Sequence, residues 1–505
     1  MKDQHFSNST SSVLFLITLY LFVFQIWAIW PFTVDDMYIT LRYARHWSEG
    51  FGLVWNINQP PVEGYSNFTF LVLAQLAVTL GVDPVVTLKS AGIVGLFITN
   101  WMLYSINRLW VNSRLAMIPC FWLLAYKGQI IWSVSGLETT VYEAMVCTSL
   151  LCIFKGLGYS YYPHIKTNPR FRWIALAGVI LALASMTRPE TPALMFLFCI
   201  LLVVDQANSK GIISKTLMLI SFSFLLIFLP YFLWRLHYYG RLFPNPIYCK
   251  GLTGVAFVLD KNYLKLIWPF ALLSLPAILQ SIKNHDHRHY FLWLPSVLYL
   301  ILLAGADSVV AFDNRLFLPV LVLFLPISLQ GLILLVGFIS SKNSLWLDGR
   351  IYLSAVLVTI FFVPMLSLAN YRHFTQNPLA GEQLRQKVLF WLQRNLPAGG
   401  TVVLGDSGFI PYKSNNQFID SYCLNNREMT MITTPGMYQR FCDEILATNP
   451  DVLILTSLIE NGKIMYAPAD ACLAKKLTNH TQYRRTWSIS SGDQHSVYRY
   501  EIFSK

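Results

Sequence analysis

Charge is scarce in this sequence. Only 13% of its 505 residues are Asp, Glu, Lys or Arg, whereas 55% are hydrophobic. A soluble globular domain carries about 25% charged residues, so the composition excludes an ordinary soluble enzyme. It indicates instead an α-helical protein that crosses the lipid bilayer many times. The 38 basic residues outnumber the 26 acidic ones, but they are scattered over loops, which argues against nucleic acid as a partner.

Cysteine is also sparse. The chain has eight cysteines, and their spacing fits no metal site. Cys249 falls in a loop. The polar C-terminal part contains Cys423, Cys442 and Cys472, and one disulfide among these three could form if that part faces an oxidising compartment. The remaining four lie in apolar runs and are expected to be buried as small hydrophobic residues: Cys120, Cys147, Cys152 and Cys199.

Long apolar runs fill the first three quarters of the chain. A membrane span needs about 20 apolar residues, and on this basis we expect about eleven spanning helices. The run 66–82 is short and contains polar residues, so we expect it to form a juxtamembrane helix at the outer face. With the N-terminus inside, most loops rich in Lys and Arg then lie on the cytoplasmic side, as the positive-inside rule predicts. The first run, 13–30, is expected to remain an uncleaved anchor.

The composition becomes polar and mixed near the C-terminus. Residues 1–372 are predicted to form the transmembrane domain, and residues 375–505 a small α/β domain on the extracytoplasmic side. The alternating stretches 484–489 and 496–503 flank Ser-Gly-Asp, which is typical of a β-hairpin. The pattern predicts the other elements of this domain as helices at 381–395 and 437–447 and strands at 401–405, 417–420 and 451–456.

Two adjacent carboxylates, Asp35 and Asp36, follow the first apolar run. Charged side chains at a membrane surface are costly and need a reason. A carboxylate at this place could act as a general base, or contribute to a metal site, next to a lipid-linked substrate. The alternative is a helix N-terminus, in which Asp35 caps the helix and Asp36 favours the positive end of the helix dipole. The two explanations can hold together.

Further short motifs follow this pair along the whole chain. In order they are Asp35-Asp36-Met37-Tyr38-Ile39 with Arg42-Tyr43-Ala44, Gly50-Phe51-Gly52-Leu53-Val54-Trp55-Asn56, Pro61-Val62-Glu63-Gly64-Tyr65-Ser66-Asn67, Ser135-Gly136-Leu137-Glu138-Thr139, Thr187-Arg188-Pro189-Glu190, Tyr239-Gly240 with Pro244-Asn245, Tyr248 and Lys250, Gly305-Ala306-Asp307, Asn314-Arg315-Leu316-Phe317-Leu318-Pro319, and Gly405-Asp406 with Gly408, Ile410 and Tyr412.

With these motifs, the chain resembles bacterial polytopic glycosyltransferases of the GT-C type, in particular the mycobacterial terminal arabinofuranosyltransferases and a similar membrane protein of Legionella. The resemblance covers nearly the whole chain. It departs from the family pattern at 308–311, where Ser-Val-Val-Ala replaces the usual Trp-Met-Pro-Gly. A second departure is Pro246, where the family usually has Thr.

The resemblance implies a reaction. A sugar, which could be a pentose such as arabinofuranose, is transferred from a polyprenyl-phosphate donor to a glycan or lipid acceptor of the cell envelope. The reaction takes place at the extracytoplasmic face of a bacterial inner membrane and inverts the anomeric centre by a single displacement. It requires no cofactor. A divalent cation could take part, but two neighbouring carboxylates are too few for a closed site, so no residue is assigned as a metal ligand.

The same resemblance assigns roles to particular residues. Asp35 is the expected general base, and Asp36 orients it or binds sugar hydroxyls, although the reverse order is also open. The donor phosphate is expected to bind Arg188, Lys250 and Arg315, because it needs cations rather than a general acid. The alternative for Arg188 is a purely structural pair with Glu190. The expected sugar and acceptor ligands are Arg42, Glu63, Tyr65, Glu138, Glu190, Asn245 and Asp307; Glu138 could also pair with Arg42.

Two other classes of function remain open at the level of sequence. A transporter or flippase of lipid-linked sugars should have inverted repeats and mid-membrane charges, and no repeat is visible here. A non-catalytic envelope scaffold whose C-terminal domain binds glycan would not need the Asp35–Asp36 pair.

Overall fold

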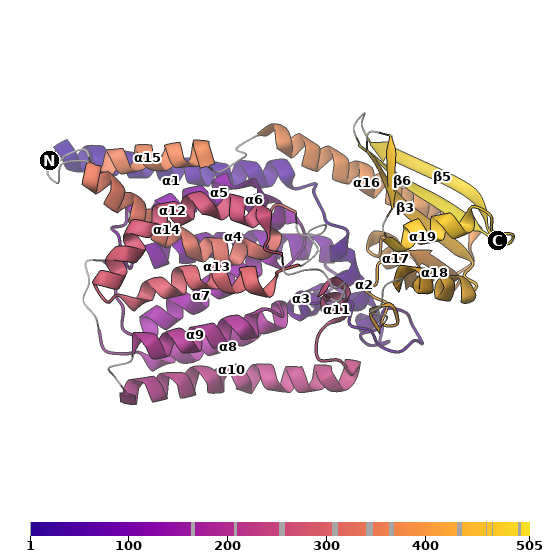
Figure 1. The fold of residues 1–505 in the computed structure, drawn as a ribbon, viewed down its shortest axis with the longest axis horizontal. Coiled ribbons are helices and arrows are strands. Elements are labelled where there is room, and N and C mark those ends of the chain that lie inside the picture. Colours follow the sequence, from indigo (N-terminus) through magenta and orange to yellow (C-terminus); the bar gives the residue numbers. More distant parts are fainter. Residues whose placement is uncertain are drawn as a thin grey trace.

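The computed structural model describes residues 2–505 except for 163–166, 207–209, 252–257, 306–311, 340–346, 363–367, 432–436, 461, 467 and 493–495. A helical bundle forms the larger part, and a mixed sheet with four α-helices forms the C-terminal part (Figure 1). The N-terminus and the C-terminus lie at opposite ends of the molecule.

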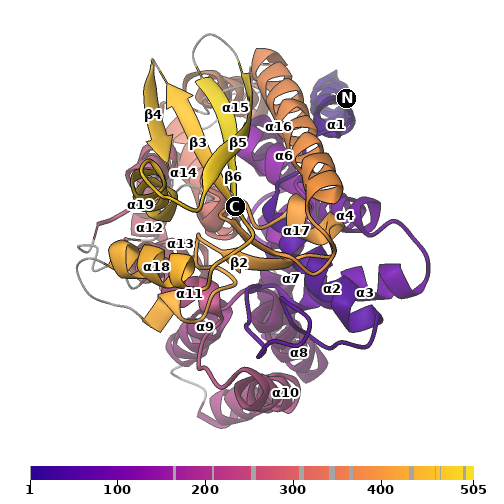
Figure 2. The ribbon, with the colours of Figure 1, turned by 90° about the vertical axis from the view of Figure 1, so that its right-hand side faces the viewer.

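The bundle consists of helices of very different length. Helices α1 and α15 lie along one side and α10 along the other, in both views (Figures 1 and 2). The α-helices of the bundle are α1 (Lys2–Ile29), α2 (Asp36–Ser48), α3 (Phe68–Thr79), α4 (Pro84–Asn107), α5 (Ile118–Ala125), α6 (Lys127–Val134), α7 (Thr139–Gly156), α8 (Phe171–Thr187), α9 (Thr191–Asp205), α10 (Lys210–Tyr239), α11 (Asn245–Gly251), α12 (Lys261–Lys283), α13 (Tyr290–Leu302), α14 (Leu318–Ile339) and α15 (Leu347–Phe362).

Several of these helices could cross a membrane. Among the described residues, four are long and apolar enough: Pro84–Asn107, Ile213–Tyr239, Lys261–Lys283 and Arg315–Ile339. A fifth span results if Leu115–Ala125 and Lys127–Val134, which meet at a 70° bend, are counted together. Shorter apolar helices occur as well, and the expected number of about eleven spans stays a prediction.

Close helix packing in the bundle depends on glycine. A Cβ atom at Gly92 in α4 would lie 2.2 Å from the Ser133 carbonyl oxygen, and one at Gly178 in α8 would lie 2.4 Å from the Ile220 carbonyl oxygen. Small residues allow helix backbones to approach closely where lipid provides no hydrophobic drive for association. These two contacts fix α4 against α6 and α8 against α10.

The run 66–82 forms a short helix, α3, of 12 residues, and its position at the membrane surface stays a prediction. Together with α2 and α11, it lies at the end of the bundle that faces the C-terminal domain (Figure 1). Nine of the 13 residues of helix α2 are buried, among them the consecutive residues 37–44, so most of the helix is enclosed on all sides. The first loop is therefore placed between the bundle and the sheet.

The C-terminal part is the predicted small α/β domain. Its sheet has the order β2-β1-β3-β6-β5, with β4 paired to β3. Strand β1 pairs in parallel with β2 and β3, whereas β6 pairs antiparallel with β3 and β5. Helix α16 runs beside β5 (Figure 2). The elements are α16 (Leu368–Asn395), β1 (Thr401–Leu404), α17 (Phe409–Lys413), β2 (Gln417–Asp420), α18 (Met437–Ala447), β3 (Val452–Glu460), β4 (Lys463–Tyr466), α19 (Pro468–Leu477), β5 (Arg484–Gly492) and β6 (Ser496–Ser504).

Sequence patterning found most of this domain but missed three elements. The strands at 401–405, 417–420 and 451–456 and the hairpin are present, whereas α17, β4 and α19 were not predicted. The first helix begins at Leu368, earlier than the expected residue 381. Helix α17 has only five residues, too few to show a helical period.

Candidate functional site

Asp35 lies between the two domains. Its Oδ2 accepts a hydrogen bond from the backbone N–H of Gly408 (2.9 Å) and its Oδ1 one from Phe409 (2.9 Å). The Nε of Arg385 in α16 lies 3.1 Å from the same Oδ1. The expectation that Asp35 caps the following helix is wrong, because its side chain makes no capping bond to α2. The carboxylate turns instead toward the C-terminal domain.

A second carboxylate, Asp406, lies next to Asp35. Arg385 Nε donates to Asp406 Oδ2 at 2.8 Å, and the Tyr500 hydroxyl donates to the same oxygen. Burial raises the pKa of Asp35 well above its ordinary value; the charge of Arg385 opposes this shift and the charge of Asp406 adds to it. Burial alone would raise the pKa of Asp406, but the charge of Arg385 and the hydrogen bonds with Asp35, Arg385 and Tyr500 together lower it. Asp35 is thus the member of the pair that takes up a proton first.

Asp36 is the first residue of α2, and its side chain is half-buried. Two residues further along, Tyr38 packs edge-on against Phe409 at 5.2 Å between ring centroids and lies 5.7 Å from the ring of Tyr412. The start of α2 is therefore enclosed by aromatic side chains from α17.

Arg42 connects the domains and forms no ion pair with any residue in the described part of the chain. Its nitrogens donate to the carbonyl oxygens of Trp55 (2.8 Å), Pro411 and Asn416 (3.2 Å). The guanidinium lies over the rings of Trp55 and Phe418, at 4.8 and 5.2 Å. The suggested pair of Arg42 with Glu138 is not formed. Arg42 instead holds the first loop, α2 and the C-terminal domain together.

Glu63 and Tyr65 also have partners within the protein. Glu63 forms an ion pair with Arg235 of α10 (2.8 Å), and both side chains are buried. The hydroxyls of Tyr65 and Tyr239 lie 2.9 Å apart. These contacts join the first loop to the end of α10.

Glu138 is the centre of a buried charge cluster at the start of α7. Its Oε1 accepts from Arg188 Nη1 (3.1 Å) and Arg315 Nη2 (3.0 Å), and its Oε2 accepts from Asn67 (3.0 Å). Burial raises the pKa of Glu138, but the charges of Arg315 and Arg188 outweigh burial and lower it to about 2. The sequence indicated that a buried Glu138 needs a partner, but it suggested Arg42 or the sugar, whereas the structure has Arg188 and Arg315.

Two of the arginines predicted to bind phosphate, Arg188 and Arg315, differ in how many of their nitrogens already donate hydrogen bonds within the protein. Arg188 also donates to Glu190 through Nε (3.2 Å) and Nη2 (2.7 Å), so all three of its nitrogens bind carboxylates. Arg315 donates from Nε to Thr139 and from Nη2 to Glu138. Its Nη1 makes no hydrogen bond to any residue that the structure describes. The terminal Nη1 group of Arg315 is therefore available to a ligand, whereas every nitrogen of Arg188 is already directed at a carboxylate.

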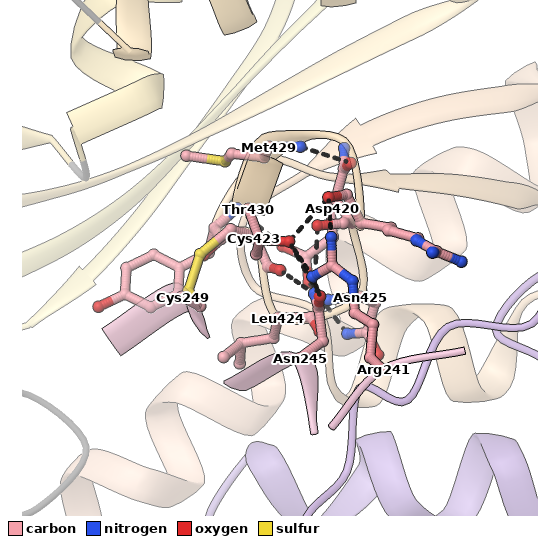
Figure 3. Close-up of a disulfide and its surroundings, with 12 residues drawn as sticks. Arg241, Asn245, Cys249, Asp420, Cys423, Leu424, Asn425, Met429 and Thr430 are labelled. Atoms are coloured by element: carbon pink, nitrogen blue, oxygen red, sulfur yellow. Dashed lines mark hydrogen bonds between the residues drawn. A yellow bond between two sulfur atoms is a disulfide. The ribbon is translucent and has the colours of Figure 1, made fainter. Parts of the chain in front are cut away.

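Asn245 lies at a covalent connection between the domains (Figure 3). Its amide nitrogen donates to the carbonyl oxygens of Cys423 (2.8 Å), Leu424 (3.0 Å) and Asn426 (3.1 Å). Beside it, Cys249 forms a disulfide with Cys423. The expected pairing among the three C-terminal cysteines is therefore wrong: Cys442 and Cys472 are free thiols. Sequence could not find the partner, which is 174 residues away.

Two predicted site residues cannot be placed. Lys250 belongs to α11, but its side chain is outside the described part of the structure, as is the whole of Asp307. Among the described residues, no three His, Cys, Asp or Glu side chains gather closely enough to bind a metal ion.

Sequence reasoning missed one buried cation near the first loop. Lys89 of α4 donates to the carbonyl oxygens of Trp30 and Phe32 (2.9 Å) and to Thr33 Oγ1 (3.3 Å). In the described part of the chain, no carboxylate lies within ion-pair distance of its Nζ. The only signal in the sequence is a single lysine within the apolar run 85–107.

Comparisons with known proteins support the fold. The model of a domain of unknown function (DUF8728) matches residues 369–503. No curated protein matches the chain. The crystal structure of ArnT from Cupriavidus metallidurans bound to undecaprenyl phosphate is similar over 97% of this chain and 97% of its own, at 12% identity and a TM-score of 0.59.

An archaeal enzyme is similar to the same extent. Oligosaccharyltransferase AglB from Archaeoglobus fulgidus, in complex with an inhibitory peptide and a dolichol-phosphate, matches 97% of this chain and 80% of its own, at 11% identity and a TM-score of 0.62. The apo form of that oligosaccharyltransferase covers 95% of this chain at a TM-score of 0.59. The chain therefore has the fold of the GT-C glycosyltransferases, with a C-terminal sheet domain.

Proposed function

We propose that this protein is an integral-membrane glycosyltransferase that uses a polyprenyl-phosphate sugar as donor. One observation carries the proposal: nearly the whole chain shares its fold with a structure bound to undecaprenyl phosphate and with one bound to dolichol-phosphate. The acceptor is a glycan or lipid of the bacterial cell envelope. A pentose such as arabinofuranose is the narrower proposal for the sugar, and it rests on the sequence motifs alone.

Asp35 is the proposed general base. The acceptor hydroxyl must lose a proton as it attacks the anomeric carbon, and a base works best when its pKa is near the working pH. Burial raises the pKa of Asp35 toward that range. Its Oδ2, which receives a hydrogen bond from Gly408, is the oxygen proposed to take the proton of the acceptor hydroxyl. Asp36 and Glu190, both half-buried, are the proposed ligands of sugar hydroxyls.

Arg315 and Lys89 are the proposed partners of the donor phosphate. The leaving group is already an anion, so it needs a cation or N–H donors to stabilise the charge that develops on it. Arg315 has Nη1 available. Lys89 already donates to Trp30, Phe32 and Thr33, so it is proposed to act through its positive charge rather than through a hydrogen bond. The carbonyl of Phe32 accepts from Lys89, and the ring of Phe32 packs edge-on against Phe312 at 6.4 Å. Phe312 lies three residues before Arg315, so the segments that carry Lys89 and Arg315 meet through these two rings. Arg188 is proposed to support Glu138 rather than to bind phosphate.

The active side is proposed to be extracytoplasmic. Disulfides persist in oxidising compartments, and the Cys249–Cys423 bond joins the C-terminal domain to the α10–α11 region. This supports an inner-membrane location with the C-terminal domain outside. The reaction is proposed to proceed by one inverting displacement without a required metal, which predicts that a chelator leaves the rate unchanged.

The test is transfer by the full-length protein in lipid nanodiscs. Purified protein is mixed with a panel of labelled polyprenyl-phosphate pentoses and hexoses and with envelope lipids from cells that lack the gene. Transfer of one label, lost by about 10²-fold or more in Asp35→Asn, would support the proposal. Asp443→Asn, a change at an exposed carboxylate, is the control. Transfer that is unaffected in both Asp35→Asn and Asp36→Asn would overturn the catalytic assignment, and no transfer with any donor would overturn the function.

A further inference from the structure

Arg385 bridges carboxylates that belong to different domains. Its Nε is 3.1 Å from Asp35 of the first loop and 2.8 Å from Asp406, which follows β1. The three side chains are 11–17% exposed, so solvent screens this contact only partly. One cation thus serves two buried carboxylates, and the C-terminal domain supplies both the cation and the second carboxylate.

Building on the proposed function, we propose that the C-terminal domain is part of the catalytic machinery and that Arg385 is the positioning residue for Asp35. A glycan-binding accessory domain would need no charged contact with the base. Here α16, the turn after β1 and the start of α17 all converge on one carboxylate of the membrane domain.

The backbone of the C-terminal domain fixes the orientation of Asp35. The N–H groups of Gly408 and Phe409 each hold one carboxylate oxygen at 2.9 Å. An ideal Cβ at Gly408 would lie 2.2 Å from Asp35 Oδ2 and 2.1 Å from the Asp35 carbonyl oxygen. Only glycine permits this approach, since any side chain would push Asp35 away. The Gly405-Asp406-x-Gly408 motif therefore provides the second carboxylate and the close backbone contact.

The charges around Asp35 come from every element packed against it. They belong to Arg385 of α16, Asp406 after β1, Tyr498 and Tyr500 of β6 and Tyr38 of α2. Arg385 favours the ionised form of Asp35, whereas Asp406 disfavours it. Removing these two groups should therefore move the proton affinity of Asp35 in opposite directions, which a merely structural role would not do.

The experiment measures kcat/KM against pH for the full-length enzyme in nanodiscs. Asp35 must be ionised to act, so the acid limb of the profile reports its protonation. Arg385→Gln should move this limb to higher pH by about one unit or more, and Asp406→Asn should move it to lower pH. Arg385→Lys keeps the positive charge and should therefore shift the acid limb less than Arg385→Gln does. Arg394→Gln, an exposed arginine on the same helix, should leave the profile unchanged.

A second measurement keeps the inference separate from the proposed function. Infrared difference spectra of wild type against Asp35→Asn report the carbonyl stretch of the protonated Asp35 carboxyl, whether or not sugar is transferred. The titration midpoint should rise in Arg385→Gln, or in Arg385→Lys if the first variant does not fold, and fall in Asp406→Asn. Shifts in the same direction, or none, would overturn the positioning role. Absence of transfer by wild type would instead count against the glycosyltransferase proposal.

Discussion

The Asp35 carboxylate lies 3.1 Å from the Nε of Arg385, although the two residues belong to different domains. The same pattern recurs along the interface: Arg42 donates to the carbonyl oxygens of Pro411 and Asn416, and Asn245 donates to those of Cys423 and Leu424. Many of the motifs that run through the sequence are therefore used to join the sheet domain to the helical bundle. The contacts that hold the C-terminal domain against the bundle therefore also complete the site around Asp35.

Arg42→Lys should loosen this interface. Arg42 is buried and donates to four oxygen atoms, one of them in the Asn56 side chain. A lysine cannot reach acceptors in so many directions, and each unsatisfied buried group costs about 1–3 kcal/mol. Hydrogen exchange of the full-length protein should show faster exchange of the Phe418 amide, which binds Asn56. Arg440→Lys, on the exposed face of α18, is the control. Unchanged exchange in Arg42→Lys would contradict the docking role.

Removal of the disulfide should lower stability. Cys249→Ser or Cys423→Ser frees two segments that are 174 residues apart, and loss of a native disulfide typically costs about 2–4 kcal/mol. Thermal unfolding of the full-length protein should begin at a lower temperature, with the same decrease in either single variant and in the double variant. Cys472→Ser, which removes a free thiol, should have a smaller effect. An equal decrease in all variants would argue against the pairing.

Glu138→Gln should be among the most damaging single changes. It leaves Arg188 with Glu190 as its only carboxylate and Arg315 with none. Breaking a buried ion pair on one side costs about 3–5 kcal/mol, because the other charge stays buried and unpaired. The measurement is thermal stability in detergent, compared with Glu428→Gln at an exposed site. If Glu138→Gln is as stable as the control but loses donor affinity, Glu138 binds substrate and the arginines have other support.

The C-terminal domain should become less stable as pH rises through about 6. Burial raises the pKa of Asp420 and of Asp470 to about 6. A raised carboxyl pKa means that the folded state holds the proton more tightly than the unfolded state. The contribution to stability is therefore complete below about pH 4 and is lost as pH rises through 6, by at most about 3 kcal/mol for each group.

Thermal unfolding of the full-length protein at pH 5 and pH 7 would measure this effect. The decrease between the two pH values should be smaller in Asp420→Asn and in Asp470→Asn than in wild type. An identical pH dependence in all three proteins would show that other groups control it. Burial also raises the pKa of Glu63, to about 7, so the comparison with the variants is needed to isolate the two buried carboxyls of the C-terminal domain.

The sequence by itself determined the class of protein and the outline of its C-terminal domain. Low charge and long apolar runs leave few structures other than a helical bundle in a membrane, because each backbone polar group must be satisfied within the segment. The strands of residues 401–404 and 452–460 were visible because short apolar runs between turn residues carry their own signal. The sequence also marked Asp35 and Glu138, since charge is conspicuous in such a chain.

Only the tertiary structure decided which residues form ion pairs and which cysteines form the disulfide. Arg188 rather than Arg42 pairs with Glu138, Cys249 rather than a neighbouring cysteine pairs with Cys423, and Arg385 reaches Asp35. An ion pair or a disulfide depends on distances of a few ångströms between segments far apart in the chain. Local sequence pattern contains no information about such distances. They are set when glycine contacts, such as that of Gly408 with Asp35, bring the two domains together.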